Sequence, residues 1–180
     1  MSEIKVLALV GSLRAASINR QVAELAAESA PDGVTVTTDY GLGALPFYNE
    51  DIDNADVAEP VKTLRAATAE ADAVLVVTPE YNGSIPGVVK NAIDWLSRPY
   101  GQSALNGRPL AVIGAALGQY GGVWAHDETR KSFGIAGARV VDAVSLSIPV
   151  TSLDGKHPRK SAEVVDALGD VLKKLAAEVG

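Results

Sequence analysis

Cysteine is absent from this chain, which excludes disulfide bonds, thiolate metal sites and cysteine nucleophiles. Any redox chemistry therefore has to come from a bound cofactor. Histidine is scarce as well. His126 and His157 are the only two and lie far apart in the sequence, so a histidine-based metal centre is not expected.

Long hydrophobic runs are also missing. No apolar stretch approaches the roughly 18 residues that a membrane-spanning helix needs. The first residues carry no basic region ahead of an apolar stretch, and Ile4 to Val10 is short and has the pattern of a strand. We therefore expect a cytoplasmic protein without a membrane partner.

Positive charge is in the minority, since the formal net charge is -6. Nucleic acid is not expected as a partner, because phosphate backbones are bound by basic surfaces. Local backbone amides and one arginine still suffice to hold a small anionic ligand. The 180 residues, of which 47% are hydrophobic and 21% charged, suit one globular domain spanning residues 1–180.

Segments with strand and helix patterns alternate along the chain. Apolar or β-branched runs predict strands at 4–10, 34–38, 72–78, 110–116 and 139–144. Apolar residues at helical spacing predict helices at 18–29, 57–68, 86–97, 121–137 and 160–179. This alternation implies a parallel sheet with helices on both faces. It predicts an α/β, flavodoxin-like three-layer sandwich with strand order 2-1-3-4-5, because the six-stranded dinucleotide-binding fold usually needs a longer chain.

A polar loop, residues 11–20, follows the first predicted strand. Gly11 permits a tight turn, and the helix that begins at Ile18 offers free backbone amides with partial positive charge, which together suit an anion such as a phosphate. The loop has neither the Gly-Lys-Ser/Thr sequence of nucleotide hydrolases nor the Gly-x-Gly-x-x-Gly fingerprint. Two hydroxyls, an amide and a full charge are available to the anion from Ser12, Ser17, Asn19 and Arg14. The alternative is that Ser17 only caps the helix and Arg14 is a solvated surface charge.

A second polar loop, residues 78–87, follows the third predicted strand and suits a flat ring. Its backbone amides and the Asn82 side chain can donate to ring atoms, Tyr81 can cover or edge the ring, and Gly83 permits a close approach. We expect Ser84 to cap the next helix, with Pro86 in its first turn. A purely structural loop, with Tyr81 packed on a neighbour and Asn82 bonded to the backbone, is an equally weighted alternative.

The third loop, Leu117 to Gly122, follows the fourth predicted strand and belongs to the same edge of the sheet. Its three glycines, Gly118 among them, suit a close approach of the backbone to a ligand. Flexibility without a binding role explains the same composition. In open parallel sheets, ligands bind just beyond the carboxyl ends of the strands, so the three loops together indicate one ligand with a phosphate and a flat ring.

With these loops in view, the chain resembles the NADPH-dependent FMN reductases, a family that includes quinone, chromate and azo-dye reductases. The family pattern Gly-Ser-Leu-Arg-x-x-Ser-x-Asn is matched by Gly11 to Asn19. A second pattern, Pro-Glu-Tyr-Asn-x-Ser-x-Pro-Gly-x-x-Lys-Asn-Ala-Ile-Asp-Trp, is matched from Pro79 to Trp95. The chain departs from the family at Trp124, where many relatives have arginine, and at His126, where glutamine is frequent.

The resemblance implies that the first loop binds the FMN phosphate and the second lines the isoalloxazine ring. By that resemblance the phosphate contacts come from Ser12, Arg14, Ser17 and Asn19, and the ring contacts from Pro79, Glu80, Tyr81, Asn82 and Gly83, with Ser84 supporting the loop and Gly118 close to the ligand. It also implies a homodimer or homotetramer, for which Leu45 to Asp51 and the helix carrying Trp95 offer apolar contacts. A buried position for Trp95 is an equally good interpretation.

The resemblance further implies a reaction in which NADPH or NADH passes hydride to bound FMN. The acceptor is then a small molecule: a quinone, an azo compound, a metal oxyanion or free flavin. The flavin carries this chemistry, so we assign no catalytic residue and no metal. A flavodoxin-type electron carrier that docks on protein partners is the main alternative. An enzyme of the same fold that binds a sugar phosphate or a nucleoside is a third.

Overall fold

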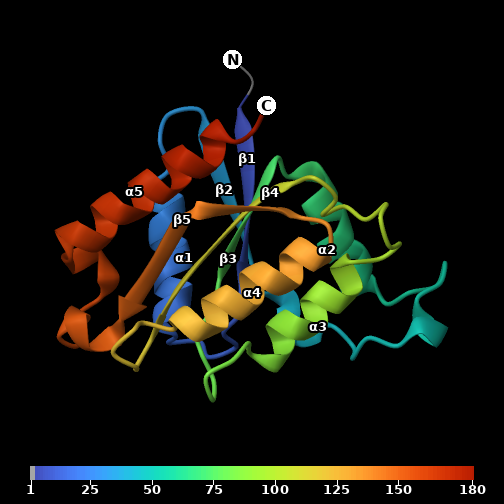
Figure 1. The fold of residues 1–180 in the computed structure, drawn as a ribbon, viewed down its shortest axis with the longest axis horizontal. Coiled ribbons are helices and arrows are strands. Elements are labelled where there is room, and N and C mark those ends of the chain that lie inside the picture. The colour runs from blue at the N-terminus through green and yellow to red at the C-terminus, as the bar shows by residue number, and fades with distance from the viewer. Residues whose placement is uncertain (1–2) are drawn as a thin grey trace.

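A computed structural model describes residues 3–180. One parallel sheet organises it, with the order β2-β1-β3-β4-β5 that the sequence predicts (Figure 1). The strands are β1 (Ile4–Val10), β2 (Val34–Asp39), β3 (Ala73–Val77), β4 (Pro109–Ala116) and β5 (Arg139–Pro149). Since every strand runs in the same direction, all their carboxyl ends reach one edge of the sheet.

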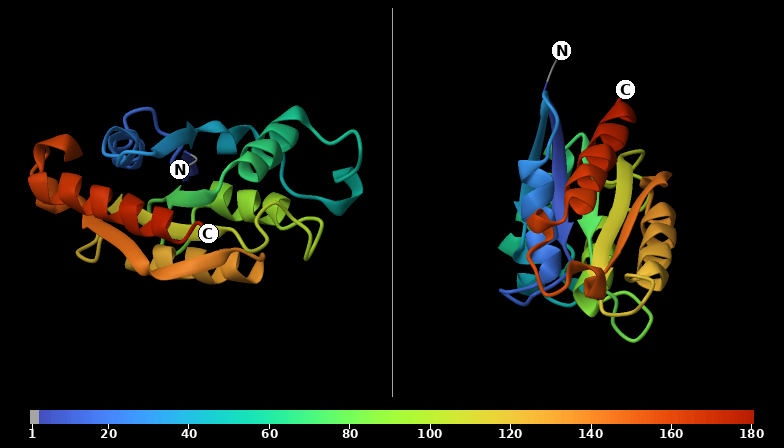
Figure 2. Two further views of the ribbon diagram at one scale, coloured as in Figure 1. Left: turned by 90° about the horizontal axis from the view of Figure 1, so that it is seen from above. Right: turned by 90° about the vertical axis from the view of Figure 1, so that its left-hand side faces the viewer.

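Helices cover both faces of this sheet (Figures 1 and 2). On one face lie α1 (Ile18–Glu28) and α5 (Ala162–Ala177), and on the other lie α2 (Glu59–Glu70), α3 (Gly87–Leu96) and α4 (Val123–Ile135). The flavodoxin-like three-layer architecture is therefore confirmed. Short 3-10 turns, η1 (Gly41–Ala44), η2 (Glu50–Ile52), η3 (Val150–Leu153) and η4 (Pro158–Lys160), interrupt the connections. Within residues 3–180 we find no helix of the length and apolar character that crossing a membrane requires.

The central strands β1, β3 and β4 are apolar at nearly every position, because helices cover both of their faces. In β1, Val6, Ala8 and Val10 face the cluster formed with α1 and α5, whereas Leu7 and Leu9 face the cluster formed with α2, α3 and α4. Successive side chains of a strand point to opposite faces, so a strand covered on both sides has to be apolar at every position.

The fifth strand is longer than its sequence predicts, because it continues from Arg139 to Pro149 instead of ending at Val144. Its pairing with β4 is irregular: Leu110 faces Val140, but Val112, two residues later, already faces Ser145. As an edge strand it is only partly covered, with Val141, Val144 and Ile148 buried among exposed and half-buried residues, which breaks the apolar run on which the prediction rests. The longer strand carries the chain to the edge where the other strands end.

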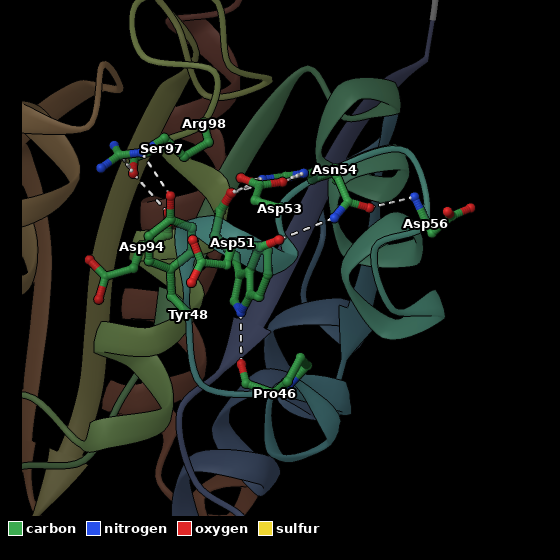
Figure 3. A network of polar contacts seen from close by, with 11 residues as sticks. Pro46, Tyr48, Asp51, Asp53, Asn54, Asp56, Asp94, Ser97 and Arg98 are labelled. Atoms are coloured by element: carbon green, nitrogen blue, oxygen red, sulfur yellow. Dashed lines mark hydrogen bonds and ion pairs between the residues drawn. The ribbon is translucent and has the colours of Figure 1, made fainter.

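The connection after β2, residues 40–58, is held against α2 and α3 by side-chain hydrogen bonds (Figure 3). The indole N–H of Trp95 donates to the carbonyl of Pro46 at 2.8 Å. Arg65 donates to both carboxylate oxygens of Asp53, at 2.8 and 2.9 Å, and also to the carbonyl of Trp95. Trp95 is completely buried, so the buried interpretation is correct and its side chain offers no contact surface.

Candidate functional site

The loops that follow β1, β3 and β4 meet at the edge formed by the strand carboxyl ends (Figure 1). Between them lies a cleft of about 440 Å³, which we call the loop cleft. The start of η3, directly after β5, closes one side of it. The lining residues are Ser12, Arg14, Ser17, Ile18, Asn19, Pro79, Glu80, Tyr81, Ala115, Ala116, Leu117, Gly118 and Val150.

The β1 side of the loop cleft has the features of an anion site. Ser12 is buried, yet its hydroxyl finds no hydrogen-bond partner within the described chain. Ser17 is the N-cap of α1, and its hydroxyl accepts from the amide of Asn19 at 3.2 Å. Ser12 and the helix cap Ser17 therefore line the same cleft, and a helix N-terminus favours negative charge.

Asn19 ties this end of α1 to the end of β4. Its side-chain amide donates to the carbonyl of Ala115 at 2.9 Å and its side-chain oxygen accepts from the amide of Ala115 at 2.8 Å. Asn19 is buried, and this pair of bonds uses its oxygen and one N–H. Its expected contact with a phosphate stays a prediction, while its observed role is to fix the distance between two walls of the cleft.

The loop after β3 folds into a tight hairpin. The backbones of Tyr81 and Ser84 exchange two hydrogen bonds, and Asn82 and Gly83 between them both have positive φ, at 54° and 71°. This is the type I′ turn that an Asn-Gly pair favours. The tip of the turn, Asn82 to Ser84, does not line the loop cleft, whereas Pro79, Glu80 and Tyr81 do.

The expectation that Ser84 caps the next helix is wrong. The N-cap of α3 is Pro86, and no side chain bonds to the helix start. The reason is that Ser84 closes the hairpin through its backbone, which leaves it two residues ahead of the cap position. Ser84 is thus part of the turn rather than of the helix.

Glu80 links the hairpin loop to α4. Its carboxylate accepts from the amide of Ala125 at 3.1 Å, in the first turn of that helix. A carboxylate is favoured at this position, because the first amides of a helix lack partners and carry partial positive charge. The residue expected to line the ring thus also holds α4 against the loop.

His126 is completely buried and connects the residue that follows β3 to the carboxyl-terminal part of β5. Nε2 lies 3.1 Å from the carbonyl of Thr78, which can only accept, so Nε2 carries the proton. Nδ1 lies 2.7 Å from the hydroxyl of Ser147. Burial lowers the pKa of His126 below its ordinary value, so the neutral ring is favoured. Gly114 makes this packing possible, because a Cβ there would lie 2.0 Å from the carbonyl of Thr78.

The structure brings most of the predicted residues together: Ser12, Arg14, Ser17, Asn19, Pro79, Glu80, Tyr81 and Gly118 all line the loop cleft, and Asn82, Gly83 and Ser84 do not. The sequence does not single out five further lining residues, namely Ile18, Ala115, Ala116, Leu117 and Val150, although Leu117 begins the third predicted loop. Ile18 and Leu117 adjoin predicted residues, and Ala115 and Ala116 end the predicted fourth strand; none of these four apolar side chains has a pattern that marks a ligand contact. Val150 could be found only by placing the end of β5 correctly.

Comparison with known proteins agrees with this geometry. The family model for NADPH-dependent FMN reductase matches residues 4–151. A quinone reductase from Pseudomonas putida is 47% identical over 133 residues, which are 73% of this chain and 71% of that protein. A quinone reductase from Escherichia coli K12 is 34% identical over 168 residues, 92% and 88% of the two chains.

A solved structure is similar along nearly the whole chain. The flavoenzyme NAD(P)H:(acceptor) oxidoreductase FerB from Paracoccus denitrificans superposes with a TM-score of 0.85 at 32% identity, covering 98% of this chain and 97% of that one. The family match includes the loops after β1, β3 and β4 that form the loop cleft. The chain belongs to the NADPH-dependent FMN reductase family.

Proposed function

We propose that this protein is an NAD(P)H-dependent oxidoreductase that holds FMN in the loop cleft and reduces a small-molecule acceptor. The observation that carries the site is Ser12, which lines this cleft together with the α1 N-cap Ser17 and whose buried hydroxyl has no hydrogen-bond partner in the described chain. A buried polar group of this kind costs free energy unless a ligand satisfies it, so it fits the phosphate of FMN. The family membership supports a reductase over an electron carrier.

On the β1 side, Ser12, Ser17 and the first amides of α1 would bind the phosphate, and Arg14, which is exposed on the rim, would add charge. Asn19 would hold the spacing between the phosphate end and β4. The ring end would lie against Pro79, Tyr81 and the glycine at position 118, where a Cβ meets no atom within 4 Å. A direct ring contact from Asn82, Gly83 or Ser84 requires the hairpin tip to move toward the cleft.

When bound, FMN supplies two-electron chemistry, accepting hydride from the nicotinamide and passing the electrons to the acceptor. For a quinone, the net reaction is NAD(P)H + H⁺ + quinone → NAD(P)⁺ + hydroquinone. The protein would contribute the orientation of the ring and an open mouth for the two substrates. Quinones, azo compounds, metal oxyanions and free flavin are the candidate acceptors, and either NADH or NADPH the donor.

We further propose that residues 1–180 form one FMN-binding domain that acts in the cytoplasm, where reduced nicotinamide is available. A homodimer or homotetramer is proposed on exposed apolar side chains. Phe47 is 88% exposed, and Tyr100 and Ile135 line a separate surface groove between α3 and α4. Exposed apolar side chains mark protein contact surfaces when they form a contiguous patch. Light scattering coupled to size-exclusion chromatography measures the assembly directly.

The decisive experiment is an absorbance titration of the protein with FMN, followed by anaerobic addition of NADPH or NADH. We expect flavin that stays bound after desalting and is bleached by the nicotinamide, with the colour restored by a quinone. Bound flavin that reduced nicotinamide leaves unchanged would contradict the reductase. Absence of any flavin binding would contradict the site itself.

Arg14→Ala tests the phosphate end of the site. Removing a charge-assisted hydrogen bond costs about 1.5–3 kcal/mol, so the dissociation constant of FMN should rise roughly ten- to hundredfold. Arg139→Ala is a matched control, because Arg139 is an exposed arginine at the start of β5, on the opposite edge of the sheet. Equal affinities for the two variants would remove Arg14 from the site.

A further inference from the structure

Two aromatic side chains stand exposed beside the loop cleft without lining it. Tyr120 is 56% exposed and Trp124 is 58% exposed. Their rings meet edge to face, with centroids 5.9 Å apart. Large aromatic side chains normally bury most of their surface, so a pair that touches and still leaves more than half of each residue exposed can contact another ring.

The pair is continuous with the walls of the cleft. The segment that carries Tyr120 is a tight turn closed by a hydrogen bond from the amide of Gly121 to the carbonyl of Gly118, and Gly118 lines the cleft. Trp124 packs on the hairpin tip, since a Cβ at Gly83 would lie 3.8 Å from its indole ring. The indole therefore lies against the same hairpin that carries Tyr81, a residue of the cleft lining.

The charged side chains that follow Trp124 along α4 are two carboxylates and two cations paired with them. Asp127 and Glu128 are exposed one turn further along α4. The nearest cations on that helix, Arg130 and Lys131, are paired with these same two carboxylates at 2.9 and 4.0 Å. Within the lining of the loop cleft, Arg14 is the cation, and it belongs to the β1 side. The amide of Ala125, in the positively polarised first turn of α4, is already bonded to Glu80. A negatively charged acceptor would therefore find no unpaired cationic side chain on this helix.

We propose that Tyr120 and Trp124 form an acceptor subsite that selects flat, uncharged aromatic rings over anionic acceptors. This inference rests on the proposed function, because it concerns the second substrate of the same cleft. A neutral quinone would stack on the exposed aromatic faces and place its carbonyl-bearing ring at the mouth between Tyr81 and Leu117. A metal oxyanion has no aromatic ring to stack, and a sulfonated quinone can stack but would find no unpaired cationic side chain for its sulfonate.

Steady-state kinetics test the selection. We would measure kcat/KM of the FMN-loaded enzyme for menadione, for a sulfonated naphthoquinone and for ferricyanide. In Trp124→Ala we expect kcat/KM for menadione to fall about tenfold, as for loss of an aromatic contact, with ferricyanide unchanged. Trp124→Phe should retain most of the wild-type value. Ile52→Ala, which removes an exposed apolar side chain in η2, away from the loop cleft, is the control that should change nothing.

Fluorescence gives a readout that needs no turnover. The chain has two tryptophans, and Trp95 is completely buried while Trp124 is exposed. Menadione added to the oxidised protein should quench the exposed component with saturation, and the sulfonated quinone should require a much higher concentration. Trp124→Phe should lose this quenching, because the fluorescent side chain is gone, and should keep the selectivity in kcat/KM, because an aromatic ring remains.

Failure of this inference is distinguishable from failure of the proposed function. If Trp124→Ala binds FMN and is reduced by NADPH but keeps wild-type selectivity, or loses activity equally toward all three acceptors, the subsite is wrong and the reductase stands. Weakened FMN binding in Trp124→Ala would also overturn the subsite, because the indole would then serve the cofactor or the fold. If no acceptor is reduced by the wild-type protein, the proposed function fails, and unsaturable quenching would reject the subsite as well.

Discussion

Asn19→Ala should be the most informative single substitution in the loop cleft. The side chain satisfies the amide and the carbonyl of Ala115 with bonds of 2.8 and 2.9 Å, in a position that is 3% exposed. Its removal leaves two backbone groups without partners, at about 1–3 kcal/mol each. Water that enters from the adjoining cleft can offset part of this cost. We therefore expect a loss of about 2–4 kcal/mol in the free energy of unfolding.

For a chain of this length, such a loss corresponds to a decrease in Tm of roughly 4–16 °C. Urea unfolding and differential scanning calorimetry measure the two quantities, and an FMN titration of the folded variant measures the effect on the cleft. Asn106→Ala is a matched control, because Asn106 is an exposed asparagine in the turn before β4, and it should change stability by less than about 0.5 kcal/mol. A similarly small effect of Asn19→Ala would refute the assignment of these two bonds as a structural tie.

Four further substitutions test the packing at Gly114 and Gly118, the titration of His126, and the interior of α5. Gly114→Ala would place a Cβ 2.0 Å from the carbonyl of Thr78, so we expect a loss of about 3 kcal/mol or more in urea unfolding, whereas Gly118→Ala, with open space around it, should be nearly neutral. The lowered pKa of His126 means that the unfolded chain takes up a proton that the folded chain does not. The stabilisation that the neutral His126 ring contributes should be fully present above the ordinary pKa of 6.5 and should be lost as the pH falls below it. His126→Gln should therefore make the free energy of unfolding less dependent on pH in denaturant titrations from pH 5 to 8. A slope that is unchanged in His126→Gln would assign the acid sensitivity to other groups. Gly169→Ala, inside α5 with the nearest atom 3.9 Å away, should stabilise the protein by about 0.5–1 kcal/mol; a loss of stability would show that the helix needs the glycine for packing.

Much of the fold is predictable because local pattern and burial agree. The continuous apolar run of β1 is typical of a strand covered on both faces, and the structure buries it on both. The fifth strand shows the limit of this reasoning. Its pairing with β4 shifts in register, and its uncovered residues need not be apolar. The apolar pattern that predicts a strand therefore ends before the strand itself ends.

The site was predictable in its location and less so in its details. Loops at strand ends identify the cleft, since the topology of a parallel sheet fixes where they gather. What Asn19 bonds to, by contrast, depends on Ala115, far away in the sequence, and no local pattern contains that information. The sequence predicts a helix cap at Ser84 because serine favours caps. The Asn82-Gly83 turn instead pairs the backbone of Ser84 with that of Tyr81, which keeps Ser84 in the hairpin and out of the cap position.

The hydrogen bonds of the connection between β2 and α2 have a consequence for Phe47. Pro46 and Tyr48, its two neighbours, are both bonded to α3, through Trp95 and Asn91. The backbone that presents this exposed phenyl ring is therefore ordered by folding itself. A partner that buried the ring would pay little conformational entropy to fix the segment, so a contact of modest area there would retain more of its gross binding energy.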